Sequence, residues 1–400
     1  MRINGTGCSL VDNLYSHVPF STGTFASLRT RQEGDGGLNI GGLVFAEDLA
    51  GFAGMKYEEV LHRITGRDTP DSYNLGGPAI IPLVHAAQLL AGRSSVETAF
   101  HGVRGNDEAG RRIENLLDGI PVNLSAYHRI AGPTPTTEVF SDPAFDEGRG
   151  ERSFVNRTGV AGDPRAAVFD EDFFQGDIVF FGGTGLVPPL HDDLTDLTRR
   201  ARRSGAFVVI TTVFDFRNHK RNPHQPWPLV DDYTVVDLVV TDKEEALRIT
   251  GESQAEGAAQ WFIHQGAGAA VVTQGTDEVL IRGRSTRFAP LSVDRLPVCE
   301  AVGEQLRTIT HPHDTTGCGD NFVGGMLAAM AAQMDRGEQE IDLAAAVACG
   351  VVSGGFAATY LGGLYRESEP GEKRDAVALL WEPYRHQVAH RLTLPEKLPV

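Results

Sequence analysis

The sequence predicts an α/β protein built around a mainly parallel sheet. Short runs rich in β-branched residues alternate with amphipathic stretches over most of the chain, and this alternation is typical of βαβ units. At 400 residues the chain is long enough to bury a large core, as one domain or as two. Several predicted helices end on a glycine that suits the left-handed position after a helix, namely Gly119, Gly205, Gly251 and Gly266.

The β-branched runs predict strands, and the amphipathic stretches between them predict helices. The expected strands cover residues 98–104, 177–182, 207–213, 236–241, 269–273 and 278–282. The expected helices cover residues 79–91, 107–117, 188–203, 243–250, 254–265, 319–334, 341–358 and 372–387. Capping boxes are predicted at two helix starts, from Ser253 with Glu256 and from Thr241 with Glu244.

Two segments break this alternation and are expected to lie outside the α/β core. Residues 13–75 are rich in glycine and irregular in pattern. Within residues 127–158, the runs 136–140 and 151–155 flank an acidic turn and predict a β-hairpin. Beyond residue 365, we expect one more helix and a tail that ends near a proline.

The composition excludes several classes of protein. The formal net charge of −17 disfavours nucleic acid and anionic membranes, so neither is expected as a partner. No signal-peptide pattern and no apolar run of about 18 residues occurs. The four cysteines lie far apart without a CxxC pair, which argues against a disulfide framework or a zinc site. These features predict a cytoplasmic protein.

The most informative segment covers residues 314–320 (DTTGCGD) and runs into the uncharged helix predicted over 319–334. Gly317 and Gly319 allow a tight turn and a close approach of a ligand to the backbone. The helix adds the positive end of its dipole, which favours phosphate oxygens. Asp320 would repel a phosphate, but it suits a base that takes a proton from a hydroxyl nucleophile. The segment predicts a phosphoryl-transfer site, and a glycine turn with Asp320 as a helix N-cap is the alternative.

This segment resembles the DTTGAGD signature of the ribokinase-like sugar kinases, the PfkB family, with Cys318 where alanine is usual. The resemblance implies that Asp320 is the catalytic base and that Gly317, Cys318 and Gly319 form an anion hole for the transferring phosphate. ATP would then contact Thr316, Gly317 and Gly319. The implied fold is a Rossmann-like three-layer α/β/α domain with a mainly parallel sheet and a small β-sheet lid.

Further matches to the family concern the acceptor. Asp12 matches an aspartate that accepts hydrogen bonds from sugar hydroxyls, and a solvated turn aspartate is the alternative. Gly76 and Gly77 match the two glycines of the family's GGxxN motif. This chain has Ile80 at the position of the motif's asparagine. An ordinary glycine turn is the alternative for this pair.

Arg217 is the last candidate for the acceptor site. It matches the arginine of the family's DxNxR stretch, with Asp215 in place of the asparagine. A planar guanidinium fork would suit a phosphate or a substrate carboxylate. A surface arginine fits the sequence equally well.

The donor side shows weaker matches. Asp242 and Glu245 match the family's NxxE motif with Asp for Asn, and the resemblance makes Glu245 the acid that orders water around Mg²⁺. Helix capping is the alternative for this stretch. Thr273 and Gly275 match a TxG loop, so the resemblance assigns Asp242, Thr273 and Gly275 to ATP. Asp314 is the candidate for a monovalent cation, with K⁺ expected as in some relatives.

The resemblance divides the chain into three parts. The α/β kinase core would comprise residues 1–12, 74–126 and 159–364. Residues 13–73 and 127–158 would form the lid and an insertion, and residues 365–400 a C-terminal helix and tail. A homodimer formed through the lid is a further expectation.

These matches predict an ATP-dependent kinase that transfers the γ-phosphate to a hydroxyl of a sugar or related small polyol, with Mg²⁺. A nucleoside kinase is the first alternative, and it would need an apolar or aromatic slot for a base. A non-catalytic sugar or nucleotide sensor is the second, because Ile80 and Asp242 depart from the family pattern. The intact Asp320 loop argues against the sensor.

Overall fold

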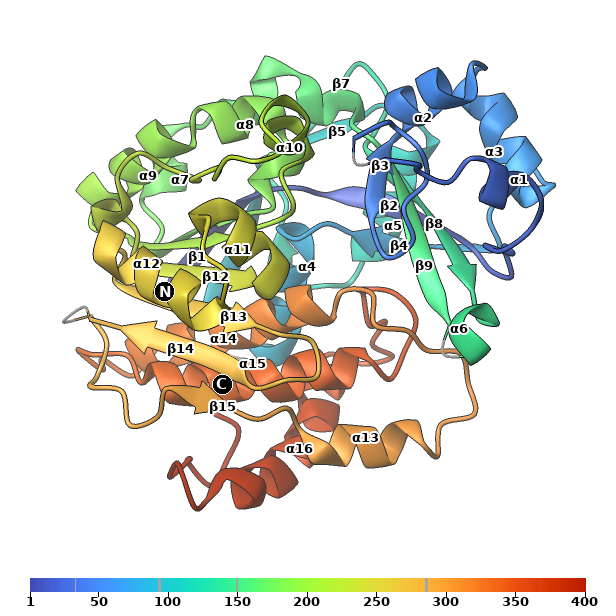
Figure 1. Cartoon of the computed structure of the whole chain (residues 1–400). Coiled ribbons are helices and arrows are strands. Elements are labelled where there is room, and N and C mark those ends of the chain that lie inside the picture. Colours follow the sequence, from blue (N-terminus) through green and yellow to red (C-terminus); the bar gives the residue numbers. More distant parts are fainter. Residues whose placement is uncertain (33, 93–94, 149, 285–286) are drawn as a thin grey trace.

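The computed structural model describes residues 1–32, 34–92, 95–148, 150–284 and 287–400. It confirms the predicted class, because helices cover both faces of a large, mainly parallel sheet and a smaller sheet stands beside it (Figure 1). The six predicted strands are present, with ends that shift by no more than two residues. Within the described residues, no helix combines the length and the apolar character needed to cross a membrane.

The larger sheet contains ten strands of the described chain. Its spatial order is β15 (Arg295–Leu296), β14 (Val279–Gly283), β13 (Ala269–Thr273), β12 (Leu238–Asp242), β11 (Phe207–Thr211), β10 (Ile178–Gly182), β1 (Arg2–Gly7), β5 (Glu97–Gly105) and β6 (Val122–Asn123). β7 (Tyr127–Ile130) pairs with β5 outside this path. All neighbours from β13 to β7 are parallel, whereas β14 and β15 are antiparallel.

The central strands are buried on both faces because helices cover both sides. β10 reads IVFFG and β11 reads FVVIT, and every residue of both is buried, as expected of strands inside a parallel sheet. One helix layer consists of α4 (Ile80–Leu89), α5 (Glu108–Leu117), α14 (Cys318–Asp335), α15 (Leu343–Ala357) and α16 (Glu372–Val388). The opposite layer consists of α7 (Glu171–Phe174), α8 (Pro188–Asp192), α9 (Leu194–Arg203), α11 (Lys243–Thr250) and α12 (Ala255–Gln265).

The chain crosses from the large sheet to the lid directly after β1. Gly7 ends this strand with a φ of 132°, and a Cβ there would lie 1.8 Å from the carbonyl oxygen of Gly182. The amide of Cys8 donates to that same oxygen at 3.0 Å. Only glycine fits this close approach, which directs the chain into the lid beside the carboxyl ends of the parallel strands.

In the described part of the chain, the lid is a sheet of five strands with one helix-covered face. Its order is β3 (Leu43–Phe45), β9 (Glu151–Arg157), β8 (Thr136–Asp142), β2 (Leu10–Tyr15) and β4 (Ser72–Gly76). The predicted hairpin is confirmed as β8 and β9, which are antiparallel and joined through a short turn, α6 (Phe145–Gly148). Its outer face is covered by α1 (Gly23–Ser27), α2 (Ala46–Ala53) and α3 (Tyr57–Thr65).

The irregular pattern predicted for residues 13–75 is wrong for much of this segment. α3 buries Tyr57, Val60 and Ile64, a helical spacing that the surrounding glycine-rich sequence obscures. These side chains pack with Phe20 and Phe140 in a separate hydrophobic core. The insertion therefore supports the lid from outside.

The sheets cross some of the predicted domain limits. β2 starts at Leu10 and β4 ends at Gly76, so the lid sheet takes in residues 10–12 and 74–76. β7 belongs to the larger sheet, although it falls in the predicted lid segment 127–158. The division into core, lid and tail otherwise remains a prediction.

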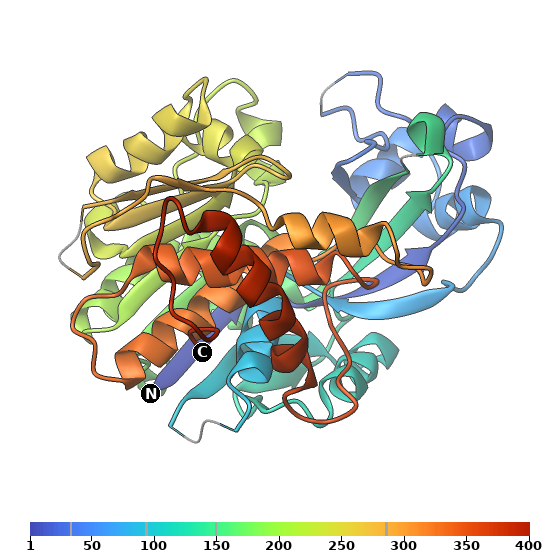
Figure 2. The ribbon, with the colours of Figure 1, turned by 90° about the horizontal axis from the view of Figure 1, so that it is seen from below.

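The C-terminal segment is part of the main core. Its side chains Val377, Trp381, Tyr384 and Val388 are buried in the same cluster as α14 and α15. Figure 2 shows this segment, in red, lying over the layer that contains these two helices. α13 (Glu300–Leu306) packs beside it and leads towards the loop before α14.

Helix boundaries differ from prediction at three places. The helix predicted over 188–203 is divided at Asp193 into α8 and α9. The capping box at Ser253 is wrong, because the residue before α12 is Gln254 and no side chain caps that end. The box at Thr241 is also wrong, because Asp242 caps α11 by accepting from the amide of Glu245 at 2.8 Å. The four predicted helix-ending glycines all have positive φ.

Trp381 offers a test of the contribution of α16 to the core. Its side chain is 2% exposed, and its Nε1 donates to the Pro395 carbonyl at 3.0 Å. Trp381→Ala should lower the free energy of unfolding by about 3–5 kcal/mol, measured by chemical denaturation. Leu379→Ala on the same helix, where the side chain is 79% exposed, should change it by less than about 0.5 kcal/mol. Equal, small effects of both variants would show that α16 is not part of the cooperative core.

Candidate active site

The segment 314–320 forms a fixed turn that leads into α14. Gly317 has a φ of 75° and precedes the first helical residue, and a Cβ there would lie 2.5 Å from the Cα of Gly363. The Asp314 carboxylate accepts from the amide and hydroxyl of Thr316 at 3.0 and 2.9 Å, and from the amide of Gly362 at 3.1 Å. This carboxylate therefore joins the turn to the loop that follows α15.

The amides at the start of α14 face open space in part. A Cβ built on Gly319 meets no atom within 4 Å, so a ligand can approach the backbone there. The amide of Cys318 already donates to the Thr315 carbonyl, at a long 3.3 Å. The helix dipole adds positive potential at this end. A phosphate-sized anion could reach the amides of Gly317 and Gly319, which have no hydrogen-bond partner within the described part of the chain.

Asp320 lies in the first turn of α14 without a charged partner. Gly317 is the residue that precedes the helix, so the alternative of Asp320 as N-cap is wrong. Within the part of the chain that the structure describes, no side chain or amide bonds to the Asp320 carboxylate. Burial raises the pKa of Asp320 to about 7. A carboxyl that titrates near neutral pH and has no partner is suited to accept a proton.

Asp12 lies opposite, on the lid strand β2. Its side chain is 7% exposed, and burial together with the charges of Asp320 and Asp314 raises its pKa to about 8. Gly76 makes room for it, because a Cβ at Gly76 would lie 2.2 Å from Asp12 Oδ2. Gly77, with a φ of 118°, brings the chain against the Cys8 carbonyl. The predicted acceptor residues Asp12, Gly76 and Gly77 therefore lie together beside Asp320.

A row of polar side chains extends from Asp12 across the lid. In register, Asn74 of β4 is paired with Asp12, Asp12 with Thr137 of β8, and Thr137 with Asn156 of β9. The Asn156 amide donates to the Thr137 hydroxyl at 3.0 Å. The Asn74 amide donates to the Leu361 carbonyl at 2.8 Å, which places this end of the row over the loop after α15. Paired strand residues share one face, so the row faces the α14 side.

Arg152 connects the lid to the turn before α14. From β9 it donates to the hydroxyls of Thr315, at 2.6 Å, and of Thr316. Its Nη1 also lies 4.0 Å from Asp314 Oδ2. This contact was not predicted from the sequence. Its only signal was the period of β9, in which Arg152, Phe154 and Asn156 share a face.

The predicted donor residues lie at the carboxyl ends of neighbouring strands. Asp242 of β12 is in register with Thr273 of β13, and the Thr273 hydroxyl lies 3.5 Å from the Thr241 carbonyl. Gly275 follows with a φ of 64°, and a Cβ there would meet nothing within 4 Å. This edge is where ligands of open parallel sheets bind.

Glu245 provides a carboxylate that suits a hydrated divalent metal. Its side chain accepts a hydrogen bond from the Thr212 hydroxyl, and burial together with the nearby Asp242 raises its pKa to about 8. Among the described residues, no cationic side chain pairs with it. Magnesium retains several waters and needs few carboxylates, so this donor set fits an ion held through water.

Arg217 does not join the other predicted residues. Arg217 lies on α10 (Phe216–Arg221), and its guanidinium pairs with Asp192 of α8 at 2.7 Å. Asp215, which replaces the family asparagine, caps α10 and accepts from His191 Nε2 at 3.0 Å. The role of Arg217 on substrate therefore remains a prediction.

A buried lysine holds the turn from the C-terminal side. Asn321 donates to the carbonyls of Gly317 and Gly363 at 2.8 and 2.9 Å. Lys373 of α16 in turn donates to Asn321 Oδ1 at 2.8 Å and to Gln88 Oε1 at 3.0 Å. Lys373 is 1% exposed, and burial lowers its pKa to about 7. No sequence pattern connects Lys373 with residues 314–320, so only the structure could find it.

The geometry agrees with comparisons to known proteins. Residues 65–365 match the family described as pfkB family carbohydrate kinase. Since this match covers well over half of the chain, the chain belongs to the PfkB family. It is a kinase that uses ATP, with a divalent metal, to phosphorylate a sugar or a related substrate. The family expected from residues 314–320 is confirmed.

Individual relatives have sugar and nucleoside substrates in their names. A fructokinase of Vibrio alginolyticus is 25% identical over 263 residues, which are 65% of this chain and 77% of the relative. An aminoimidazole riboside kinase of Salmonella typhimurium is 23% identical over 233 residues, 58% and 67% of the two chains. The adenosine kinase of Schistosoma mansoni, solved with 2-fluoroadenosine, superposes with a TM-score of 0.65 at 14% identity, covering 94% of this chain and 98% of its own.

The buried Lys373 predicts a dependence of stability on pH. Its pKa is about 7 when folded and 10.5 as a free side chain, so the unfolded chain holds more protons between these values. The parent should therefore gain stability as the pH rises from 7 to 9, while Lys373→Met should not. The melting temperature of the variant relative to that of the parent should therefore fall as the pH rises from 7 to 9. The exposed Lys397→Met is the control, and a difference independent of pH at Lys373 would contradict the assignment.

Proposed function

We propose that this protein transfers the γ-phosphate of ATP to a hydroxyl of a sugar or related small polyol, with Asp320 as the general base. One observation supports this most strongly: a half-buried carboxylate, without a partner among the described residues, lies in the first turn of α14 beside backbone amides that a ligand can approach. At a pKa of about 7, Asp320 is ionised in part at neutral pH and still basic enough to accept a hydroxyl proton.

Each neighbouring group has a role in the proposed transfer. The amides of Gly317, Cys318 and Gly319 stabilise charge on the transferring phosphoryl group. The Cys318 amide donates to the phosphoryl oxygen in place of the Thr315 carbonyl. Asp12 accepts hydrogen bonds from acceptor hydroxyls, and Gly76 and Gly77 keep the backbone close to them. Lid closure would exclude water as a competing acceptor.

The donor binds along the carboxyl ends of β12 and β13 in this proposal. Asp242, Thr273, Gly275 and the turn at Thr316 contact ATP. Glu245 would hold Mg²⁺ through water, and the ion would supply positive charge against the phosphates. A K⁺ ion at Asp314 is part of the proposal, supported only by the carbonyls and carboxylate of that turn.

Two further expectations complete the proposal. The protein would act in the cytoplasm, as the cysteine content suggests. It would form a homodimer through the lid, which light scattering can test.

An ADP-release screen over sugars, sugar acids and nucleosides, with Mg-ATP and with or without K⁺, tests the activity and the cation together. Ligand binding without ADP release for every acceptor would favour the sensor instead.

Asp320→Asn tests the proposed base directly. The variant keeps the shape of the side chain but cannot accept the proton, so turnover should fall by about 10²–10⁴-fold. Binding of a non-hydrolysable ATP analogue, measured by calorimetry, should be retained. Asp118→Asn, at an exposed aspartate, is the matched control and should keep full activity. Comparable turnover of Asp320→Asn and the parent would remove Asp320 from the mechanism.

The same variant makes a prediction about stability. The pKa of Asp320 is raised from 3.8 to about 7 in the folded protein, so folding favours the protonated form. The stability that the protonated carboxyl contributes is fully present below pH 4 and is lost as the pH rises through 7. Asp320→Asn should therefore melt above the parent at pH 8, with a smaller difference at pH 5. Parallel melting temperatures across this range would contradict the raised pKa of Asp320.

A further inference from the structure

Lys373 is a buried lysine without a carboxylate partner. Its side chain is 1% exposed. Within the described part of the chain, both of its hydrogen-bond partners are neutral amide oxygens, and no acid pairs with it. Taking an ammonium group out of water without a counter-ion costs stability. Features that a fold keeps at such a cost are found mainly at functional sites, so Lys373 is a candidate for a role in the reaction.

The ammonium group of Lys373 joins three helices. From α16 it donates to Asn321 Oδ1 on α14 at 2.8 Å and to Gln88 Oε1 on α4 at 3.0 Å. Gln88 is fully buried, and its Nε2 donates to the Tyr365 carbonyl at 2.8 Å. The Tyr360 hydroxyl adds a longer bond to Asn321 Oδ1, at 3.3 Å. With two donors on its oxygen, the Asn321 amide group turns its nitrogen towards the turn before α14.

Asn321 passes this constraint to the backbone of the turn. Its Nδ2 donates to the carbonyls of Gly317 and Gly363 at 2.8 and 2.9 Å, and its main-chain amide donates to the Gly317 carbonyl at 2.9 Å. The Gly317 carbonyl and the Cys318 amide belong to one peptide unit. Because a peptide unit is planar, a fixed carbonyl also fixes the direction of the N–H on its other side. The Cys318 amide of the proposed anion hole therefore takes its direction from Asn321.

The same lysine ties this turn to the helix that follows the proposed acceptor glycines. α4 begins three residues after Gly77. It packs closely on α14, because a Cβ at Gly324 would lie 2.6 Å from the Pro82 carbonyl oxygen. The bond from Lys373 to Gln88 joins these two helices near the same junction. Lys373 thus contacts both the helix on the acceptor side and the helix on the transfer side.

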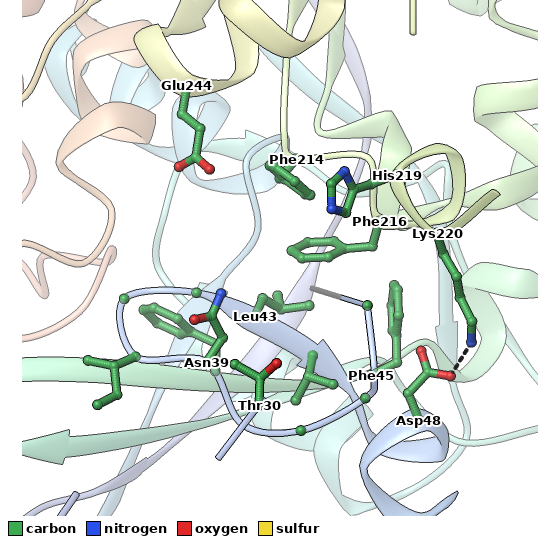
Figure 3. Close-up of a pocket in the computed structure, with 18 of the residues that line it drawn as sticks. Thr30, Asn39, Leu43, Phe45, Asp48, Phe214, Phe216, His219, Lys220 and Glu244 are labelled. Carbon is green, nitrogen blue, oxygen red and sulfur yellow. Dashed lines mark hydrogen bonds and ion pairs between the residues drawn. The ribbon is translucent and has the colours of Figure 1, made fainter. Parts of the chain in front are cut away.

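Lys373 acts on the site without contacting a ligand. A cavity of about 700 Å³ lies at the junction of the lid and the larger domain, between the loop that carries Asn39 and the segment that carries Phe214 and Phe216 (Figure 3). Neither Lys373 nor Asn321 is among the residues that line it, and both are buried. Any effect of Lys373 on the transfer must therefore pass through the groups that it holds.

We propose that Lys373 is a positioning residue for phosphoryl transfer, which acts through Asn321 on the direction of the Cys318 amide. This rests on the proposed role of that amide at the transferring phosphoryl group. The lysine sets the amide before the phosphate arrives, so that no reorganisation is needed during the transfer. The groups proposed to bind the rest of ATP do not depend on this contact.

Lys373→Met tests the role, because it keeps the length of the side chain and removes the donor. With an acceptor found by ADP release, kcat should fall about 10²-fold, as expected for a small displacement of a group at the reacting centre. The KM for ATP should stay near that of the parent.

Tyr384→Phe is the matched control. It also removes one buried donor from α16, the bond from the Tyr384 hydroxyl to the Pro297 carbonyl at 2.8 Å. Melting temperatures of both variants are measured first, and the kinetics are run well below them. The control should keep the kcat and KM of the parent. An equal fall of kcat in both variants would overturn the proposal, since it would show that α16 contributes only to the fold.

Asn321→Ala tests whether the effect is relayed. If Lys373 acts through Asn321, adding Lys373→Met to Asn321→Ala should lower kcat little further, because groups in one hydrogen-bonded chain are not additive. Two losses that multiply in the double variant would contradict the relay.

Amide hydrogen exchange provides a readout that needs no turnover. Lys373→Met should speed exchange of the Asn321 amide, which donates to the Gly317 carbonyl, whereas Tyr384→Phe should not. Unchanged exchange in Lys373→Met, or a kcat equal to that of the parent, would overturn the proposal. If the parent phosphorylates no acceptor, the proposed function fails, and the exchange rates still decide whether Lys373 holds the turn.

Discussion

The approach of the lid sheet to the first turn of α14 is the constraint on which the site depends. It brings the Asp12 carboxylate, 7% exposed, close enough to Asp320 and Asp314 for their charges to raise its pKa. Repulsion among these three carboxylates would open the interface between lid and turn if nothing opposed it. Arg152 opposes it, because it bonds both threonines of the turn and lies 4.0 Å from Asp314. The positive end of the α14 helix dipole also reduces this repulsion.

The turn is held from a second side by the C-terminal segment. Asn321 bonds the carbonyls of Gly317 and Gly363, and Lys373 fixes the orientation of Asn321. The glycine at 317 can therefore keep its left-handed conformation while the amides behind it remain available. Groups fixed before the ligand arrives stabilise developing charge without reorganisation. The lid and the tail thus converge on one turn, although they lie far apart in the sequence.

Local signals predicted most of the larger domain and the centre of the site. The strands were recognisable because buried parallel strands are continuous apolar runs, and residues 314–320 carry a specific motif. The helices of the insertion were missed because glycines surround the spacing of Tyr57, Val60 and Ile64. The contacts of Arg152 and Lys373 were missed for another reason. Their partners are distant in sequence, and only the packing of lid and tail on the domain brings them together.

The role of Asp320 as general base can be tested by a structure of the ternary complex with a non-hydrolysable ATP analogue, Mg²⁺ and an accepted substrate. We expect the acceptor hydroxyl within about 3.2 Å of an Asp320 oxygen, with the terminal phosphate against the amides of Gly317 and Gly319. The opposite result would be an Asp320 side chain turned into an ion pair, with the acceptor hydroxyl held by another base. That arrangement would rule out Asp320 as the general base.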